Sequence, residues 1–285
     1  MKIRRKRITI LIVLLVMLAF VIWQNNSITI TSLEFYNPEI QEEFNEFTIA
    51  HISDLHNRRF GSKQSILLNK LASTSPDLIV ITGDLIDRRN YSLDIAMEFI
   101  EGALEIAPVY YVSGNHEAWS GKFDLIRENL EQAGVSVLDN TESELPCGDS
   151  SILLLGLSDP DFFTSHYFEG TNTSAMEDQL RKWSDYDSFK ILLSHRPELF
   201  DLYAENKMDL IFAGHAHGGQ FRIPFIGGVV APDQGLFPEY TSGSHTKNNS
   251  TMFVSRGLGN SIIPVRIFNR PEIVVVTLKA GKPPE

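Results

Sequence analysis

Cysteine is nearly absent from this chain, since Cys147 is the only one among 285 residues. A single cysteine excludes an intramolecular disulfide and any zinc site built from several cysteines. Internal repeats and low-complexity tracts are also missing, and 19 Gly with 13 Pro are ordinary numbers, which excludes the fibrous and disordered classes. With 43% apolar residues, the chain is long enough to bury the core of one large domain or of two small ones.

Basic residues are scarce outside the N-terminus. The chain has 25 Lys and Arg against 36 Asp and Glu, and five of the basic residues fall within the first seven positions: Lys2, Arg4, Arg5, Lys6 and Arg7. The remaining 20 basic and 36 acidic residues give the rest of the chain a formal charge of −16. Such an acidic body argues against nucleic acid as a partner. It is compatible with a small phosphate ester if cations are held locally in the site.

Long hydrophobic runs are also few, and the clearest one extends from Ile8 to Trp23 without a charge. As a helix it spans about 24 Å, a little less than the ~30 Å of a bilayer core, and snorkelling of Arg7 would close the gap. We expect residues 1–26 to be a basic N-terminus with a single-pass anchor in the cell membrane. The alternative is a cleaved signal peptide, which is disfavoured because no Ala-x-Ala site follows Trp23. The positive-inside rule places the N-terminus in the cytoplasm and the rest of the chain outside it.

The remaining chain has the pattern of an α/β domain. Residues 27–46 are polar and are interpreted as a linker or a short edge strand at Ser27–Phe35, followed by a domain over residues 47–285. Short runs rich in Ile, Val and Leu predict buried strands, and apolar residues at helical spacing predict helices between the early ones. Fewer helices separate the later strands, which indicates an antiparallel component. The expected strands are Thr48–Ile52, Leu78–Thr82, Val109–Val112, Ile152–Leu157, Lys190–Leu193, Leu210–Ala213, Met252–Ser255 and Ile273–Leu278, and the expected helices are Ser65–Ser73, Leu93–Glu105, Phe123–Ala133 and Ala175–Trp183.

Five of the expected strands run directly into polar residues that can bind metal ions. In open α/β sheets, ligands bind at the carboxyl ends of the strands. One such motif alone would be a weak signal, because Gly-Asp is common in turns and a lone histidine is usually structural. His51, His166 and His245 lie outside the motifs and are expected to be structural. The candidate residues after the five strands are, in order, Asp54 and His56; Asp84, Asp87 and Arg88; Asn115 and His116; His195; and His215 and His217.

The residue types in these motifs agree with one kind of chemistry. Imidazole together with carboxylate suits Mn, Fe or Zn, whereas an all-oxygen set would suit Mg or Ca. Two divalent ions at about 3.5–4 Å need a shared carboxylate, and Asp84 is the natural bridge. Gly83, Gly114 and Gly214 are expected to let the backbone turn sharply before each motif, so that the next side chain points into the site.

The ordered set Asp-x-His, Gly-Asp-x-x-Asp-Arg, Gly-Asn-His-Glu, His and Gly-His-x-His resembles the calcineurin-like metallophosphoesterase family. The resemblance covers roughly Phe47 to Leu278, and no ligand position is replaced. It implies a four-layer αββα sandwich with two mixed β-sheets, preceded here by one N-terminal transmembrane helix. It also implies one metal held by Asp54, His56, Asp84 and His217, and another held by Asp84, Asn115, His195 and His215.

The resemblance further implies hydrolysis of a phosphoester by a hydroxide that bridges the two divalent metals, Mn, Fe or Zn. His116 would be the catalytic histidine that stabilises or protonates the leaving oxygen. Asp87 would orient the imidazole of His116, and Arg88 would either clamp a phosphate oxygen or form a surface ion pair. No protein nucleophile is required.

Motifs near the C-terminus resemble one branch of the family, the membrane-associated bacterial phosphodiesterases. They are Gly218–Gln220, Arg256–Ser261, Pro264–Arg266 and Pro271–Ile273, and their alternative explanation is a structural C-terminal hairpin near the site. With the anchor, they favour cleavage of phosphodiester or pyrophosphate-type bonds in a small-molecule, cell-envelope or lipid-linked substrate. The alternatives are a phosphomonoesterase, including a protein phosphatase, and a non-catalytic metal-binding scaffold. The segment Arg222–Gly243, rich in Pro, Gly and aromatics, is a lid, a lipid-contacting rim or an ordinary loop.

Overall fold

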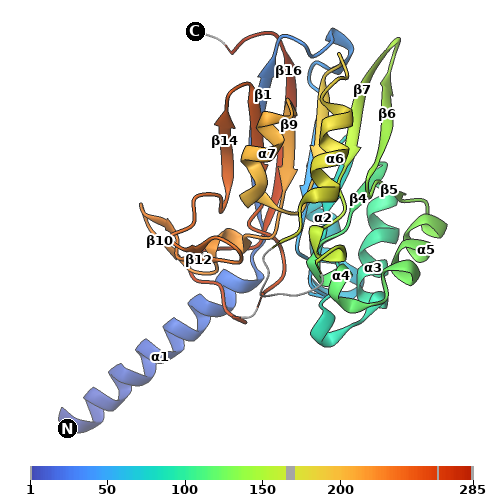
Figure 1. The fold of residues 1–285 in the computed structure, drawn as a ribbon. Helices are drawn as coiled ribbons and strands as arrows, with labels where there is room; N and C mark the ends of the chain where they lie inside the picture. The colour runs from blue at the N-terminus through green and yellow to red at the C-terminus, as the bar shows by residue number, and fades with distance from the viewer. Residues whose placement is uncertain (1, 165–170, 262, 284–285) are drawn as a thin grey trace.

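Two six-stranded sheets lie face to face in the body of the protein (Figure 1). This computed structural model describes residues 2–164, 171–261 and 263–283, and His166 lies outside them. The first sheet has the order β1-β16-β2-β3-β4-β5, in which β16 runs antiparallel to β2 and the other neighbours are parallel. Its strands are β1 (Thr29–Asn37), β2 (Thr48–Ile52), β3 (Leu78–Thr82), β4 (Val109–Val112), β5 (Ser136–Val137) and β16 (Glu272–Ala280).

The second sheet has the order β14-β15-β9-β8-β7-β6. Its four central strands are parallel, and β14 and β6 are antiparallel edge strands, so both sheets are mixed, as the sequence predicts. All eight expected strands are present, and their ends agree within two residues. The strands of this sheet are β6 (Thr141–Cys147), β7 (Ser150–Gly156), β8 (Lys190–Leu193), β9 (Leu210–Ala213), β14 (Gly243–Lys247) and β15 (Ser250–Val254).

Helices cover the outer face of each sheet. The four predicted helices are confirmed as α2 (Ser65–Ala72), α3 (Leu93–Leu104), α5 (Phe123–Ala133) and α6 (Ser174–Trp183). Two short helices, α4 (Asn115–Ser120) and α7 (Phe200–Glu205), were not predicted, because six residues are too few to show helical periodicity. Helices α2, α3 and α5 pack on the first sheet, and α6 and α7 pack on the second (Figure 1).

Three apolar cores separate the four layers. Within β3, Ile79 and Ile81 face the helices, whereas Leu78 and Val80 face the other sheet. Successive side chains of a strand point to opposite faces, so a strand between two layers must be apolar throughout. This explains why the central strands are continuous Ile, Val and Leu runs, and it confirms the four-layer αββα sandwich.

Truncation of Phe212 tests the core between the sheets. The side chain is fully buried, and its ring lies 6.1 Å from that of Phe253. Phe212→Ala should lower the free energy of unfolding by about 3–5 kcal/mol, because it leaves a cavity that the two sheets cannot close. Chemical denaturation measures this loss. Leu125→Ala, at a position 48% exposed on α5, is the control and should change stability by less than about 0.5 kcal/mol.

The N-terminal helix α1 (Lys2–Asn26) extends away from the body (Figure 1). Its stretch Arg4–Asn26 is long and apolar enough to cross a membrane. An 18-residue window of this stretch has a mean hydropathy of 2.4, and only 11% of the window is buried in the protein. The helix continues beyond Trp23 without a break, so it is longer than the apolar run alone. Strand β1 follows after two residues and pairs with β16 along its whole length, which makes residues 29–37 part of the first sheet.

Candidate metal centre

The segments that follow β2, β3, β4, β8 and β9 bring the seven expected metal ligands together at the carboxyl ends of these strands. These strands belong to two different sheets, and their carboxyl ends meet because the sheets are stacked face to face. All seven side chains are buried. They are Asp54, His56, Asp84, Asn115, His195, His215 and His217.

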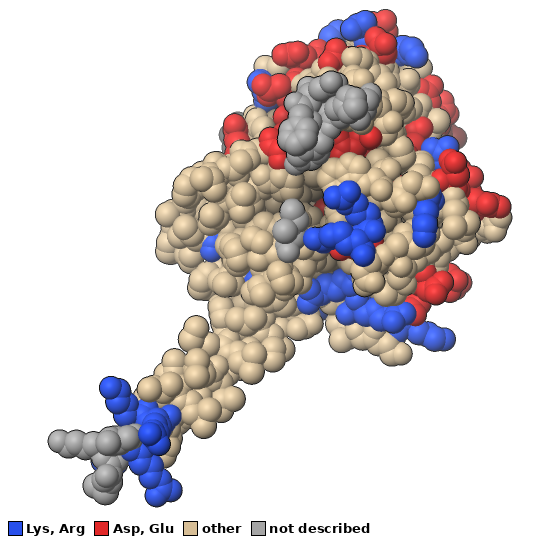
Figure 2. Space-filling model, turned by 60° about the horizontal axis from the view of Figure 1, so that its bottom comes forward, with Lys and Arg blue, Asp and Glu red and all other residues tan. Residues whose placement is uncertain are grey.

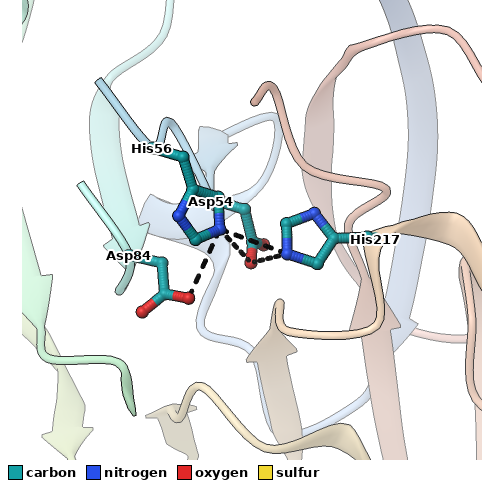
Figure 3. A group of neighbouring side chains, drawn as sticks. All are labelled: Asp54, His56, Asp84 and His217. Carbon is teal, nitrogen blue, oxygen red and sulfur yellow. Dashed lines mark hydrogen bonds and ion pairs between the residues drawn. The ribbon is translucent and has the colours of Figure 1, made fainter. Parts of the chain in front are cut away.

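The first donor group consists of Asp54, His56, Asp84 and His217 (Figure 3). One ligand atom from each lies within 4.8 Å of the others. The Nε2 atoms of His56 and His217 are 3.2 Å apart, and His217 Nε2 is 3.2 Å from Asp54 Oδ1. Asp54 Oδ1 accepts no hydrogen bond from the described residues, although it is fully buried. Buried nitrogen and oxygen atoms crowded in this way, one of them a carboxylate oxygen that accepts no hydrogen bond, fit a cation between them.

The second donor group consists of Asp84, His195 and His215, to which Asn115 adds an amide oxygen. His195 Nε2 lies 3.1 Å from both Asn115 Oδ1 and His215 Nδ1. The other ring nitrogen of His195 is 2.7 Å from the carbonyl oxygen of Thr82, which fixes the tautomer and leaves Nε2 free to bind a metal.

Asp84 lies between the two groups. Its Oδ2 is 3.4 Å from His56 Nε2 in the first group and 3.4 Å from His195 Nε2 in the second. Its Oδ1 accepts a hydrogen bond from the backbone N–H of His116 at 2.8 Å, which holds the carboxylate in this orientation. The geometry therefore suits a carboxylate shared by two neighbouring cations.

The backbone of the site is strained. Five of the seven expected ligands have a positive φ, between 47° and 64°: Asp54, His56, Asp84, His215 and His217. A side chain in this left-handed region costs about 1–2 kcal/mol, and such strain is typical of functional sites.

The glycines in these motifs do not all have a positive φ. Gly83 has a φ of 80° and does provide a sharp turn. The chain also turns at Gly114, the N-cap of α4, and at Gly214, whose carbonyl oxygen accepts from the Ala216 N–H at 2.7 Å, but neither glycine has a positive φ. A Cβ at Gly114 would lie 2.3 Å from Asp84 Oδ1, and one at Gly214 would lie 1.9 Å from the Ser53 hydroxyl oxygen. Both positions need glycine because other loops of the site pack directly against them.

The electrostatics of the site favour additional positive charge. Burial alone would lower the pKa of His195, but the Asp84 carboxylate outweighs this and raises it to about 10. Burial would raise the pKa of Asp84, yet the surrounding histidines hold it well below its usual range. The carboxylates thus remain ionised, and a divalent cation meets the same demand for positive charge as a protonated histidine.

His116 is the second residue of α4, which follows β4, and it lines a cleft of about 900 Å³ that also reaches Asp84, His215 and His217. Its Nδ1 accepts a hydrogen bond from the backbone N–H of Arg88 at 3.2 Å, so the neutral ring carries its proton on Nε2. Burial lowers the pKa of His116 to about 4.

Asp87 does not orient the His116 imidazole through a direct hydrogen bond, because the Arg88 backbone N–H donates to His116 Nδ1 instead. The Asp87 carboxylate lies 3.5 Å from His116 Nδ1 and instead accepts hydrogen bonds from Arg89. The Arg88 guanidinium lies 4.3 Å above the Trp119 ring and lines the cleft, and it forms no ion pair with the described residues.

Three charged residues near the site had no predicted role, and the first of them is the buried Glu117. It accepts hydrogen bonds from the backbone N–H groups of Asp84, Gly114 and Ile86, and so ties the β3 and β4 loops together. Burial, with the charge of Asp84, raises the pKa of Glu117 to about 7. Glu117 lies three residues after the N-cap Gly114 and accepts from its N–H, which is the Glu half of a capping box and the sequence signal that could have identified it.

Arg196 and Asp233, the other two, support the second donor group. Asp233 Oδ2 is 2.9 Å from His215 Nε2 and 2.6 Å from Arg196 Nη1. Arg196, fully buried, also donates to both oxygens of Asp159. Asp233 thereby fixes the orientation of the His215 ring, so that Nδ1 points toward the other metal-ligand atoms of the group. Carboxylates next to metal-binding histidines commonly act in this way. No sequence signal marks Asp233, because it lies in the turn between two very short strands, β12 (Val230–Ala231) and β13 (Gly235–Leu236).

Two of the three remaining histidines are described. His51 is buried in β2 and pairs with the Thr82 hydroxyl at 2.7 Å, and burial lowers its pKa to about 3. His245 is half-buried on β14, 3.2 Å from the carbonyl oxygen of Ser242. Both lie outside the donor groups.

The C-terminal segment before β16 contributes to the site, and its described residues, 255–261 and 263–271, form no hairpin. Its backbone runs along the first donor loop, with Leu258 N–H donating to Ser53 O at 3.1 Å. A Cβ at Gly257 would lie 2.7 Å from that of Asp54. The hairpin explanation is therefore wrong, and the segment acts as a wall behind Asp54.

Two stacked mixed sheets, with two adjoining groups of histidine and carboxylate donors at their strand ends, define a class of metal-dependent hydrolase with a dimetal site. The chain belongs to the calcineurin-like phosphoesterase family, whose model matches residues 47–219. It is accordingly a phosphoester hydrolase.

Known relatives and structures agree with this assignment. The chain is 30% identical over 246 residues to the uncharacterized metallophosphoesterase YkuE of Bacillus subtilis, covering 85% of this chain and 82% of YkuE. It is 27% identical over 243 residues to the phosphodiesterase YaeI of Escherichia coli, covering 81% and 82% of the two chains. The crystal structure of TT1561 of Thermus thermophilus shares the fold, with a TM-score of 0.51 and 16% identity over 74% of this chain and 89% of TT1561.

Proposed function

We propose that this protein hydrolyses phosphodiester or pyrophosphate-type bonds in a cell-envelope or lipid-linked phosphate ester. The observation that carries the proposal is the pair of donor groups sharing Asp84 at the base of a cleft of about 900 Å³. A cleft of this size accommodates a phosphorus with substituents on two sides. The similarity to YaeI, which is named a phosphodiesterase, supports the same bond type.

The residues present fit two divalent cations. Asp54, His56, Asp84 and His217 would hold one, and Asp84, Asn115, His195 and His215 would hold the other. When bound, the cations polarise the phosphoryl group and supply the positive charge that the acidic body lacks. The mixed imidazole and carboxylate donors favour Mn, Fe or Zn.

His116 is assigned to the leaving oxygen. Because its Nδ1 accepts from the Arg88 backbone, its Nε2–H is the available donor at the cleft. Arg88, held over Trp119 at the cleft wall, would pair with a phosphate oxygen. Asp87 acts indirectly: its ion pair with Arg89 orders the turn that presents the Arg88 N–H to His116.

We assign α1 as a membrane anchor with the N-terminus in the cytoplasm and the catalytic domain outside it. The five basic residues at the start of α1 support this orientation. A Danio rerio relative named a transmembrane protein with a metallophosphoesterase domain is 25% identical over 259 residues, covering 88% of this chain and 57% of that protein. It supports a membrane-associated domain of this kind.

The bond preference is tested with the full chain in detergent, stripped of metal and then supplied with Mn, Zn, Fe or Mg. Bis-p-nitrophenyl phosphate should be cleaved faster than p-nitrophenyl phosphate, and both activities should disappear with the metals. Faster monoester turnover would favour the phosphomonoesterase instead. Two bound metals without turnover of either compound or of a phosphodiester lipid would indicate the non-catalytic scaffold.

A further inference from the structure

Large apolar side chains are exposed on a lobe beside the metal cleft. The lobe consists of two short hairpins, β10 (Arg222–Ile223) with β11 (Gly227–Gly228), and β12 (Val230–Ala231) with β13 (Gly235–Leu236). With the neighbouring C-terminal segment, it exposes Ile223, Phe225, Ile226, Leu236, Phe237 and Phe268, here called the apolar face. Phe225 is fully exposed, and Leu236 is 73% exposed. Apolar side chains clustered in this way mark an interaction surface.

The apolar face is continuous with α1. The ring of Phe268 packs edge-on against that of Phe20 in α1, with centroids 5.6 Å apart. Phe268 also closes a hollow of about 330 Å³ whose remaining lining is residues 222–227. The apolar surface of the helix therefore passes directly into the apolar surface of the lobe, and Figure 1 shows β10 and β12 on the side of the body from which α1 leaves.

The junction between α1 and the body is fixed by hydrogen bonds. The Asn25 side chain donates to Arg266 O at 3.2 Å and accepts from Arg266 N–H at 2.9 Å. Arg58 donates to the carbonyl oxygen of Asn25 at 2.6 Å, and the Arg270 guanidinium lies 4.9 Å above the Trp23 ring. The helix thus holds the body at a set distance and orientation from the membrane that it crosses, which a flexible linker would not do.

Three exposed phenylalanines of the apolar face have strained backbones. The φ angles of Phe225, Phe237 and Phe268 are 69°, 53° and 52°. This conformation is an outlier for a bulky residue and is unfavourable at each position. The protein's own core does not offset the strain, because all three side chains are more than half exposed. Transfer of the three phenylalanine side chains out of water would offset it, since burial of a large apolar side chain is favourable by a comparable amount.

The charge of this region differs from that of the rest of the body. Residues 216–241 and 255–271 contain four arginines and two acidic residues, Asp233, which pairs with Arg196, and Glu239, although the chain after its first seven residues carries −16. Figure 2 shows the lobe beside the helix almost without red, whereas red gathers along the far rim of the face. An anionic lipid surface would meet little repulsion here and would repel most other faces of the body.

We propose that the apolar face docks on the bilayer that α1 crosses, with its phenylalanines at the boundary between headgroups and acyl chains. Interfacial amphipathic helices bury their apolar faces about 5–10 Å into this boundary region. The β12–β13 hairpin connects the docked surface to the cleft, since Val230 and Asp233 line the cleft while Leu236 and Phe237 belong to the apolar face. Together with the proposed function, docking would let the phosphate of a membrane lipid enter the cleft while the acyl chains of that lipid stay in the bilayer. The docking itself does not depend on catalysis.

Spin labelling of the full chain in vesicles tests the docking. In a Cys147→Ser background, a nitroxide is attached to Ile226→Cys, or to Asp149→Cys in the β6–β7 turn as the control. The vesicles contain phosphatidylcholine and phosphatidylglycerol, and a water-soluble nickel chelate is present on both sides. On reconstitution from detergent, the label at 226 should lose most of its collisions with nickel and retain those with oxygen, while the label at 149 keeps both.

Two results would overturn the docking proposal. One is equal nickel accessibility at positions 226 and 149 in vesicles. The other is protection at 226 accompanied by spin–spin broadening that disappears on dilution with unlabelled chain, because that identifies a second copy as the occupant.

A double variant, Phe225→Ser with Ile226→Ser, separates docking from catalysis. It should cleave a soluble diester at the wild-type rate and lose most of its activity on a phosphodiester lipid in vesicles. Unchanged activity on the vesicles would count against the docking. Protection of the label at 226 without turnover of any phosphoester by the wild type would leave the docking intact and refute the proposed function.

Discussion

Replacing Asp84 with asparagine is expected to abolish activity, with a loss of at least about 10³ in kcat/KM, or about 4 kcal/mol of transition-state stabilisation. The reason is geometric, because Oδ2 of Asp84 lies 3.4 Å from a histidine of each donor group. Asparagine keeps the Oδ1 that accepts from the His116 backbone but removes the charge that two neighbouring cations share. Elemental analysis should show that the metal content falls below two ions per chain.

The matched control is Asp178→Asn, the same chemical change at an exposed position on α6. It should retain both metals and full activity. If Asp84→Asn kept two tightly bound ions and normal turnover, the assignment of Asp84 as a shared ligand would be wrong. Thermal unfolding adds an independent readout, since saturating metal at 100 times its Kd stabilises by about 2.7 kcal/mol per site, and this gain should shrink in the variant.

His116→Gln is expected to lower kcat by about 10²–10⁴-fold while leaving the metal content unchanged. If the Nε2–H of His116 protonates the leaving oxygen, the loss must depend on how much that oxygen needs a proton. A substrate with an alkyl leaving group should therefore suffer more than one that releases p-nitrophenolate, which is stable as an anion. Measuring kcat over a series of leaving groups gives this dependence directly.

His245→Gln on β14, away from the cleft, controls for loss of an imidazole and should leave all rates unchanged. A uniform loss in His116→Gln across the leaving-group series would contradict proton donation and would indicate that His116 only binds the phosphoryl group. Loss of metal from the variant would instead show that the ring orders the donor groups, since it lies 4.4 Å from that of His56.

The sequence predicted the architecture well because its central strands are buried on both faces. A strand such as β3, placed between a helix layer and a second sheet, must be apolar throughout, and that run is visible without coordinates. The chain turns to polar residues where these strands end, so the seven ligand candidates could also be located. Their grouping could not be derived in the same way, since it depends on how the two sheets stack; it came from the family resemblance.

Other features depended on contacts between residues distant in sequence. Asp233 orients His215 only because the lobe folds back over the second donor group, and no local pattern records that approach. Gly214 is required because the Ser53 loop packs against it, whereas its own backbone would accept other residues. The aromatics of the segment Arg222–Gly243 are visible in the sequence, but only the folded chain brings Phe268 beside Phe225 to form the apolar face.

Local periodicity and composition thus determine the strands, the helices, the long apolar N-terminal helix and the residues able to bind metal. Tertiary packing determines which of those residues share a cation, which charged groups orient them, and where the apolar face lies relative to α1. The physical reason is that hydrophobic periodicity acts over a few residues, whereas the metal centre joins residues as distant in sequence as Asp54 and His217, and the apolar face joins Phe225 with Phe268.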